Sequence, residues 1–401
     1  MMQPRGLEAA LRLVDKGVEI PNPWSIDIAD DVDPDLISGD GVVIHPGCRL
    51  RGASTVLSAG VELGREGPVT IEDCQLGPGV QLKGGYAAKA VFLEGANLGL
   101  GHHVREGCLL EEESGGAHTV GLKQTILFPF ATLGSLINFC DALLAGGTSR
   151  SDHSEVGSSY IHFNFTPTGD KTTPSLFGDV PRGVMLREHP IFLGGQGGTV
   201  GPVRVGYGTV VGAGSVLRGD VGQEDTLTLV GSPPSLSRPF DPTVMPKLAP
   251  MVAKNLGYLA QLDALEAWYR GVRAPFFASQ PLGDHVLAGA LAALASARGE
   301  RVKRLQKLVA KLDAADPRHA PFVEHIDALV AGFGGPTPEA PGALADAAGR
   351  AAASGTRYVA AIQGLDDALV AEGTAWLAGI VEQRQDAAAS LVDGLGRVFG
   401  R

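Results

Sequence analysis

Aliphatic residues spaced six positions apart are the feature that most restricts the fold of this chain. Neither an α-helix, with its period near 3.6 residues, nor an ordinary strand, with a period of two, produces this spacing. A fixed short repeat indicates that one structural unit is stacked many times. The series contains Ile44, Leu50, Val56, Leu57, Leu63, Val69, Leu76, Leu82, Phe92, Leu98, Val104 and Leu110, and it returns after an interruption as Val205, Val211 and Leu217.

Each hexad fits a short strand that ends in a corner, and three such units make one triangular coil. The aliphatic residue is expected to point into the prism. The smaller residue four positions further, such as Cys48, Val80 or Cys108, is also expected to face inward. Frequent Gly, Asp and Asn can supply the positive φ angles that tight corners require. Strands of successive coils would then pair in parallel along the prism axis.

Residues 205–217, where hexads follow one another without a break, resemble the hexapeptide-repeat acyltransferases. The fold of that superfamily is the left-handed parallel β-helix. The resemblance therefore implies a mainly β fold, with a left-handed β-helix over residues 41–235 and inserted loops at 111–198.

The two ends of the chain have a different character. Residues 1–40 predict a short helix and extended chain that cap the open edge of the first coil. From about residue 245 the apolar period becomes helical. We expect residues 236–401 to form a helical bundle of about five helices that folds independently and is joined through the proline-rich residues 232–246. One expected packing stripe contains Leu248, Val252, Leu256, Leu259, Leu262 and Leu265, and another contains Val302, Leu305, Val309 and Leu312.

Composition restricts the class of protein. The formal net charge of −11 argues against nucleic-acid binding, which favours basic surfaces. No apolar run reaches the ~18 to 20 residues of a membrane span, and no apolar signal core follows the N-terminus. The four cysteines lie far apart without a CxxC motif, which favours buried free thiols. We expect a soluble cytoplasmic protein that binds neither nucleic acid nor membranes.

Residues 146–183 interrupt the hexads with His, Asn, Lys, Arg and Ser, which are poor material for a prism core. Such side chains suit a site for a polar, phosphorylated ligand, because loops on a rigid scaffold often carry function. A purely structural role for the stretch is the alternative.

This stretch resembles the acetyltransferase half of the bifunctional N-acetylglucosamine-1-phosphate uridyltransferase / glucosamine-1-phosphate acetyltransferase family. Ser149, Arg150, Ser151, Asp152 and His153 are similar to that family's Ser-Lys-x-x-His. Phe163, Asn164 and Phe165, followed by Lys171, are similar to its Cys-Asn-Tyr and later lysine. Residues 191–194 are similar to its Val-Phe-Val-Gly. The spacing from His153 to Asn164 is about two hexads shorter than in the family, and no Gly-rich loop of the uridyltransferase half precedes the repeats.

The resemblance implies a role for each of these residues. His153 would be the general base, with His162 as the second choice, because imidazole titrates near neutrality. Asn164 and Phe165 would lie beside the thioester of acetyl-CoA, where an amide stabilises the oxyanion, and Arg238 would also bind the cofactor. Lys171, Arg150 and Ser149 would bind the substrate phosphate. No metal is predicted.

The function that these observations favour is an acyl-CoA-dependent N-acetyltransferase for an amino-sugar phosphate or a nucleotide-linked amino sugar. The resemblance also implies a homotrimer, with residues 146–183 at the subunit interface. A non-catalytic scaffold or sugar-nucleotide-binding module, with helices that recruit a partner protein, is the alternative.

A zinc site like that of the γ-class carbonic anhydrases, formed by His102 or His103 with His118, is a third hypothesis. Hydrogen-bonded histidines at the coil corners are the simpler interpretation. The acidic residues 111–113 are expected to form a solvated loop.

Overall fold

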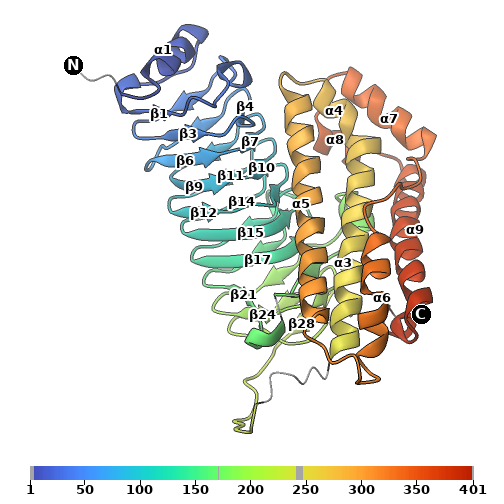
Figure 1. The fold of residues 1–401 in the computed structure, drawn as a ribbon. Helices are drawn as coiled ribbons and strands as arrows, with labels where there is room; N and C mark the ends of the chain where they lie inside the picture. The colour runs from blue at the N-terminus through green and yellow to red at the C-terminus, as the bar shows by residue number, and fades with distance from the viewer. Residues whose placement is uncertain (1–3, 170, 241–246, 400–401) are drawn as a thin grey trace.

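The computed structural model describes residues 4–169, 171–240 and 247–399. It consists of a parallel β-solenoid followed by helices that lie along one side of the solenoid (Figure 1). The predicted order, a parallel β-helix of hexapeptide repeats and then helices, is confirmed. Of the described helices, none combines the length and the apolar character that crossing a membrane requires.

Each coil of the solenoid contributes one strand to each of three rows, which we call faces 1, 2 and 3 in chain order. Faces 1 and 2 belong to one sheet, because the eight-residue strands β15 and β17 bend around the corner between them. Face 3 is a separate sheet of ten strands, to which a bridge from Glu19 to Val43 adds one further coil. All pairings between coils are parallel, as the hexads predicted.

Face 1 contains β1 (Asp27–Ile28), β3 (Arg49–Arg51), β6 (Val69–Glu72), β9 (Gly85–Ala88), β12 (His102–Val104), the first halves of β15 (Val120–Leu127) and β17 (Ile137–Leu144), β21 (Ile161–Phe163), β24 (Gly198–Val200) and β27 (Val216–Leu217). Face 2 contains β4 (Val56–Leu57), β7 (Gln75–Leu76), β10 (Ala90–Phe92), β13 (Cys108–Leu110), the second halves of β15 and β17, β22 (Ser175–Phe177) and β25 (Arg204–Val205). Face 3 contains β2 (Val43–Ile44), β5 (Glu62–Leu63), β8 (Gln81–Leu82), β11 (Asn97–Leu98), β14 (Gly115–Gly116), β16 (Thr132–Leu133), β20 (Glu155–Val156), β23 (Phe192–Leu193), β26 (Val210–Val211) and β28 (Leu227–Thr228).

The hexad residues fill the interior of the prism. Every aliphatic residue of the predicted series is at most 3% exposed, and Cys48, Cys74 and Cys108 are buried free thiols. Glycines such as Gly47 and Gly107 occupy corners with positive φ, which residues with a side chain rarely adopt. The hexads therefore predicted both the inward positions and the corners.

The N-terminal segment closes one end of the solenoid (Figure 1). Helix α1 (Leu7–Lys16) buries Leu7, Ala10 and Leu13, and two 3-10 turns, η1 (Pro23–Ser25) and η2 (Pro34–Leu36), flank strand β1. Because β1 pairs with β3, this segment also contributes strands to the first coils.

The C-terminal helices form a layer against face 2. The longer ones are α3 (Leu248–Trp268), α5 (Gly283–Val309), α6 (Ala320–Ala331), α7 (Gly342–Ala353) and α9 (Asp367–Leu391). The shorter ones are the π-turn η4 (Tyr269–Arg273), α4 (Ala274–Ala278), α8 (Tyr358–Gln363) and α10 (Leu395–Phe399). Helix α5 lies on β7, β10 and β13, while α3 contacts β22 and α9 contacts the short solenoid helix α2 (Val180–Gly183).

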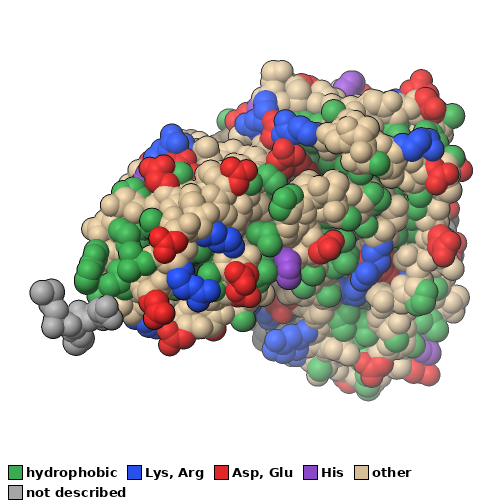
Figure 2. All heavy atoms as spheres, turned by 90° about the horizontal axis from the view of Figure 1, so that it is seen from above, with side chains coloured by type: hydrophobic (Ala, Val, Ile, Leu, Met, Phe, Trp, Pro, Cys, Tyr) green, Lys and Arg blue, Asp and Glu red, His purple; other side chains and the backbone are tan. Residues whose placement is uncertain are grey.

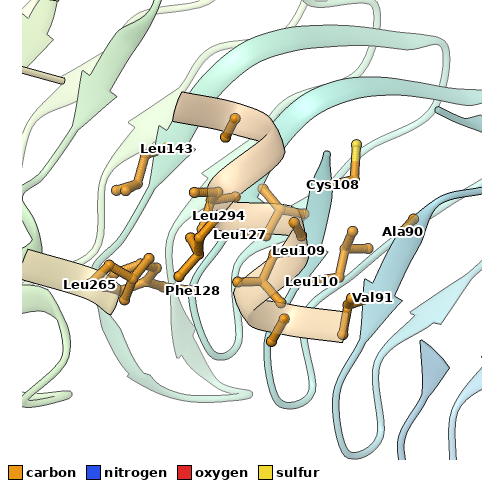
Figure 3. Close-up of a cluster of buried hydrophobic side chains, with 14 of the residues drawn as sticks. Ala90, Val91, Cys108, Leu109, Leu110, Leu127, Phe128, Leu143, Leu265 and Leu294 are labelled. Carbon is orange, nitrogen blue, oxygen red and sulfur yellow. The ribbon is translucent and has the colours of Figure 1, made fainter. Parts of the chain in front are cut away.

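The helices cover an apolar outer row of face 2. Val91, Leu109, Ile126 and Leu143 are paired neighbours on successive strands, and each is at most 1% exposed although it points out of the prism. Figure 3 shows Leu265 of α3 and Leu294 of α5 within the same cluster of buried side chains. One continuous hydrophobic core thus contains residues of both parts, whereas the sequence predicted helices that fold independently of the solenoid.

The acidic run at 111–113 also differs from expectation, because Glu111 and Glu112 are buried between face 2 and the helices. Arg273 of η4 donates to Glu112 Oε1, and its Nη1 lies 3.1 Å from Glu111 Oε1. The Tyr269 hydroxyl donates to Glu111 Oε1 at 2.5 Å. The run is therefore an ionic contact between the two parts of the molecule rather than a solvated loop.

Candidate functional site

The polar stretch forms two insertions at two different edges of face 2. Residues 146–153 leave β17 on face 2 and return to β20 on face 3 as the antiparallel hairpin of β18 (Gly147–Ser149) and β19 (Asp152–His153). The connection from β21 on face 1 to β22 on face 2 includes the described residues 164–169 and 171–174, with the 3-10 turn η3 (Pro167–Gly169). The structure therefore separates Ser149, Arg150 and His153 from Asn164, Phe165 and Lys171 by the width of one face.

Side chains within the hairpin hold it in shape. The Thr148 hydroxyl donates to Asp152 Oδ2 at 2.6 Å, and the hydroxyls of Ser149 and Ser151 are 3.1 Å apart. His153 is half-buried, and its Nδ1 is a buried atom without a hydrogen-bond partner among the described residues. Since buried polar atoms are nearly always paired, this unpaired nitrogen is an unusual feature of the hairpin.

Arg150 extends from the tip of the hairpin over face 3. Its Nη1 lies 2.9 Å from the carbonyl oxygens of Glu113 and Phe130, and 3.0 Å from Thr132 Oγ1. No carboxylate of the described residues forms an ion pair with this guanidinium, whose Nε and Nη2 have no partner there either. The arrangement holds an unneutralised cation at a fixed place on the surface.

The second insertion is more exposed and touches the helices. Phe165 is 75% exposed, Asn164 is half-buried, and Lys171 is exposed with a φ of +60°. The Lys171 carbonyl oxygen accepts a hydrogen bond from Arg301 Nη1 of α5 at 3.1 Å, so the backbone of this insertion is tied to the helical layer.

The hairpin is tied to the helices as well. Gln363 Nε2 of α8 donates to the Thr148 carbonyl oxygen at 2.6 Å. Nearby, Arg187 forms an ion pair with Asp367 of α9 at 2.6 Å. Both insertions therefore hold the edges of the helical layer, a structural role that the sequence pattern did not reveal.

His162, the second choice of base, lies inside the prism. It is 6% exposed, its ring packs edge-on against Phe139 and Phe177, and its Nε2 is 2.7 Å from Ser175 Oγ. Burial lowers the pKa of His162 to about 4. A buried imidazole that already pairs with Ser175 cannot reach a surface ligand, so the structure argues against His162 as the base.

The remaining predicted positions do not converge on either insertion. Arg238 is exposed in the segment that follows the last strand. His102 points into the prism with its Nδ1 3.1 Å from the Gly99 carbonyl oxygen, whereas His103 stacks outside on Tyr86 and His118 lies exposed beside face 3. Across the described ranges, no group of three His, Cys, Asp or Glu side chains is placed to hold a metal ion.

Two hollows of the surface lie on faces 1 and 3. The hollow on face 1 encloses about 330 Å³ and is lined by His103, Arg105, Gly121, Asn138 and Cys140. Burial raises the pKa of the Cys140 thiol, and the Cys140 Sγ donates to Asn138 Oδ1 at 3.2 Å. This cysteine is thus a poor nucleophile.

The hollow on face 3, which we call the face 3 groove, encloses about 410 Å³. Its polar lining comes from five successive coils and the hairpin, and includes Glu66, Lys83, Asn97, His118, Thr132 and Arg150. Of the residues predicted for the acetyltransferase site, Arg150 lines the face 3 groove, while His103 and His118 of the zinc hypothesis line the hollow on face 1 and the face 3 groove respectively. The sequence did contain a signal for this groove, because Gly115 stands in the outward row between Asn97 and Thr132 and leaves that row without a side chain.

Comparison with known proteins identifies similar sequences over the solenoid. The chain is 27% identical over 210 residues to the bifunctional protein GlmU of Thermotoga sp. (strain RQ2), which covers 52% of this chain and 41% of that protein. It is 27% identical over 203 residues to the GlmU of Trichlorobacter lovleyi, with 50% and 39% covered, and 29% identical over 190 residues to that of Kineococcus radiotolerans, with 47% and 34% covered.

The chain therefore spans less than half the length of these relatives. No family model matches the sequence. The matches and the β-solenoid together fit the hexapeptide-repeat half of GlmU, which confirms the resemblance seen in the sequence.

Proposed function

We propose that this chain is an acyl-CoA-dependent N-acetyltransferase that acts on an amino-sugar phosphate or a nucleotide-linked amino sugar. The similarity to the GlmU proteins along the solenoid supports a transferase of amino-sugar metabolism. The observation that carries the proposal in this chain is the hairpin of residues 146–153, which presents a cation and a half-buried imidazole three positions apart in the sequence.

His153 is the proposed general base. Its imidazole would take a proton from the acceptor amine as the nitrogen attacks the thioester carbonyl, and the CoA thiolate would leave with the pair of electrons from the broken carbon–sulfur bond. Base catalysis requires a neutral imidazole within hydrogen-bond reach of the amine. Arg150 and Ser149 of the same hairpin would bind the phosphate.

Asn164, Phe165, Lys171 and Arg238 are proposed to bind acetyl-CoA and the sugar phosphate. Because a single chain carries Asn164 and His153 at different prism edges, this part of the proposal needs a second copy of the chain. We therefore propose a homotrimer in which residues 146–183 lie at the subunit interface. Light scattering at micromolar concentration should give three times the chain mass, and a monomeric mass would contradict the shared site.

A thiol-release assay with acetyl-CoA and a panel of amino-sugar phosphates tests the activity. Replacing a positioned general base usually lowers the rate by about 10²- to 10⁴-fold, so His153→Ala should lose most of its turnover. His285→Ala is the matched control, because His285 is exposed at the start of α5. Equal turnover of His153→Ala and the control would remove His153 from the mechanism.

A sugar-nucleotide-binding module without catalysis is the second candidate. The observation that favours it is the use of both insertions as anchors for the helices, through Thr148 and Lys171. This candidate predicts binding of a nucleotide sugar, with neither thiol release nor acetyl-CoA binding, in calorimetric titrations of the same protein.

A further inference from the structure

We propose that the hollow on face 1 binds a planar aromatic carboxylate, whose ring would stack on His103 and whose carboxylate would pair with Arg105. The inference is independent of the proposed acetyltransferase, because the hollow contains neither the hairpin of residues 146–153 nor the insertion with Asn164 and Lys171. It rests on the regular spacing of the strands and on one outward position that carries no side chain.

The outward row of face 1 is interrupted at Gly121. Tyr86, His103, Gly121 and Asn138 are paired neighbours on successive strands. The rings of Tyr86 and His103 are stacked, with their centroids 5.1 Å apart, so the other side of the imidazole faces the empty position at Gly121. Neighbouring strands lie about 4.8 Å apart, so an aromatic ring at that position would be within the ~4.5 to 7 Å at which rings stack. The hollow therefore leaves room for one missing aromatic side chain.

The backbone does not require glycine at residue 121. Gly121 does not have a positive φ, and a Cβ atom there would meet the Ile137 carbonyl oxygen at 3.4 Å, which is an ordinary contact distance. By contrast, a Cβ atom at Gly198, further along the same row, would lie 2.7 Å from Phe163 Cε1. The fold therefore tolerates a side chain at residue 121, and the open space beside His103 is not a by-product of backbone geometry.

The polar side chains that line the hollow offer hydrogen-bond donors. Asn138 Oδ1 already accepts from Cys140 Sγ, and its Nδ2 has no partner among the described residues, so the amide presents N–H groups. Arg105 is exposed, and it forms no ion pair with a carboxylate of the described residues. The adjacent Glu106 pairs with Lys123 instead, at 2.7 Å. A ligand that fits the hollow must therefore accept hydrogen bonds and carry negative charge.

A carboxylate attached to an aromatic ring meets these conditions. It lies in the plane of the ring, accepts paired hydrogen bonds from a guanidinium, and leaves the face of the ring free to stack on the imidazole. The hollow of about 330 Å³ is near the lower end of the range for small-molecule sites, about 300 to 1,000 Å³, so a ligand of one or two rings suits it.

A ligand-observed NMR titration of the full chain with benzoate tests the inference. Benzamide, which is flat but uncharged, and cyclohexanecarboxylate, which is charged but not flat, each lack one of the two interactions. Gly121→Phe places a ring of the chain itself in the hollow, and Arg105→Gln removes the charge. Thr70→Phe is the matched control, because Thr70 lies in the same row on the other side of Tyr86. Thermal unfolding shows whether each variant is folded.

We expect saturable binding of benzoate that is about tenfold weaker in Gly121→Phe and in Arg105→Gln, and unchanged in Thr70→Phe. Benzamide and cyclohexanecarboxylate should bind the unaltered protein more weakly than benzoate. Absence of saturable binding, or equal weakening in Thr70→Phe, would overturn the inference. Full benzoate binding by Arg105→Gln would also overturn it, even if Gly121→Phe does not fold.

Two further outcomes would reject the class of ligand. Cyclohexanecarboxylate that binds as tightly as benzoate would refute the stacking on His103. Displacement of benzoate by an equal concentration of uridine or adenosine would refute the carboxylate and assign the hollow to an uncharged heteroaromatic ring.

Discussion

Arg273 connects the helices to the solenoid through a buried cluster of charges and aromatic rings. Its guanidinium lies 3.8 Å from the Tyr358 ring centroid and 4.6 Å from that of Tyr269, next to two buried carboxyl groups. Arg273→Met would leave both carboxyls buried without a cation, so we expect the free energy of unfolding to fall by about 3 to 5 kcal/mol. Denaturant titration of the two proteins measures this difference in the free energy of unfolding. Combining Arg273→Met with Glu111→Gln and Glu112→Gln should recover part of the loss, and no recovery would contradict the electrostatic cause.

The same cluster predicts how stability depends on pH. Burial raises the pKa of Glu111 and raises that of Glu112 to about 7, although Arg273 lowers both. A carboxyl whose pKa is higher in the folded than in the unfolded state stabilises the fold while it is protonated. The stability that these two carboxyls contribute should therefore fall as the pH rises from about 4.5 to 7, whereas buried His162, whose pKa is lowered to about 4, acts in the opposite direction over most of the same window. In urea titrations across that window, the free energy of unfolding of the natural chain should fall relative to that of Glu112→Gln. A constant difference between the two proteins would show that Glu112 does not titrate in this range.

At the scale of elements, face 2 explains what could and could not be predicted from the sequence. The hexads predicted which residues point inward, because that pattern is local. Runs such as residues 90–93 and 142–145 are apolar on both sides of the strand, which signals a strand covered on both faces. The covering element could not be predicted, because the partners are far apart in the chain: Arg273 and Glu112 are separated by 161 residues.

The site was predicted less well than the fold for a related reason. Composition was sufficient to locate the polar stretch. It did not reveal that the two insertions lie at different edges of face 2, or that one histidine points inward. His162 lies between the outward residues Ile161 and Phe163 on β21. Because side chains of a strand alternate between its two sides, this pattern indicated that His162 is buried, but the interpretation of the stretch as a loop missed it.

The apolar outer row of face 2 leads to a prediction for a chain of residues 1–240. Without the helices, Val91, Leu109, Ile126 and Leu143 would form an exposed apolar surface, so this truncated chain should aggregate. The matched variant has Val91→Lys, Leu109→Glu, Ile126→Lys and Leu143→Glu, which alternate in charge along the row. Size-exclusion chromatography and circular dichroism should show a soluble β-rich protein. A soluble, unsubstituted 1–240 chain would instead favour independent folding.

For the whole molecule, one core shared by solenoid and helices predicts one unfolding transition. Trp268 is fully buried in α3, where its Nε1 donates to Tyr358 OH at 2.8 Å, so its fluorescence reports on the helical layer. The exposure of the buried thiols of Cys48, Cys74 and Cys108 to a thiol reagent reports on the solenoid. The two signals should change at the same urea concentration. Two separated transitions, with the helices melting first, would show that the interface is weaker than its burial indicates.

The covered face also restricts how copies of the chain can associate. Charges of both signs are interspersed on the surface seen in Figure 2. The helices occupy face 2, so a closed ring of solenoids would join face 1 of one copy to face 3 of the next, and every contact would be heterologous. A ligand in the face 3 groove would then meet the neighbouring copy on the same surface. Ligand binding and assembly of the ring are then coupled equilibria. A ligand that contacts both copies stabilises the ring, whereas a ligand that competes with the neighbouring copy for the groove destabilises it.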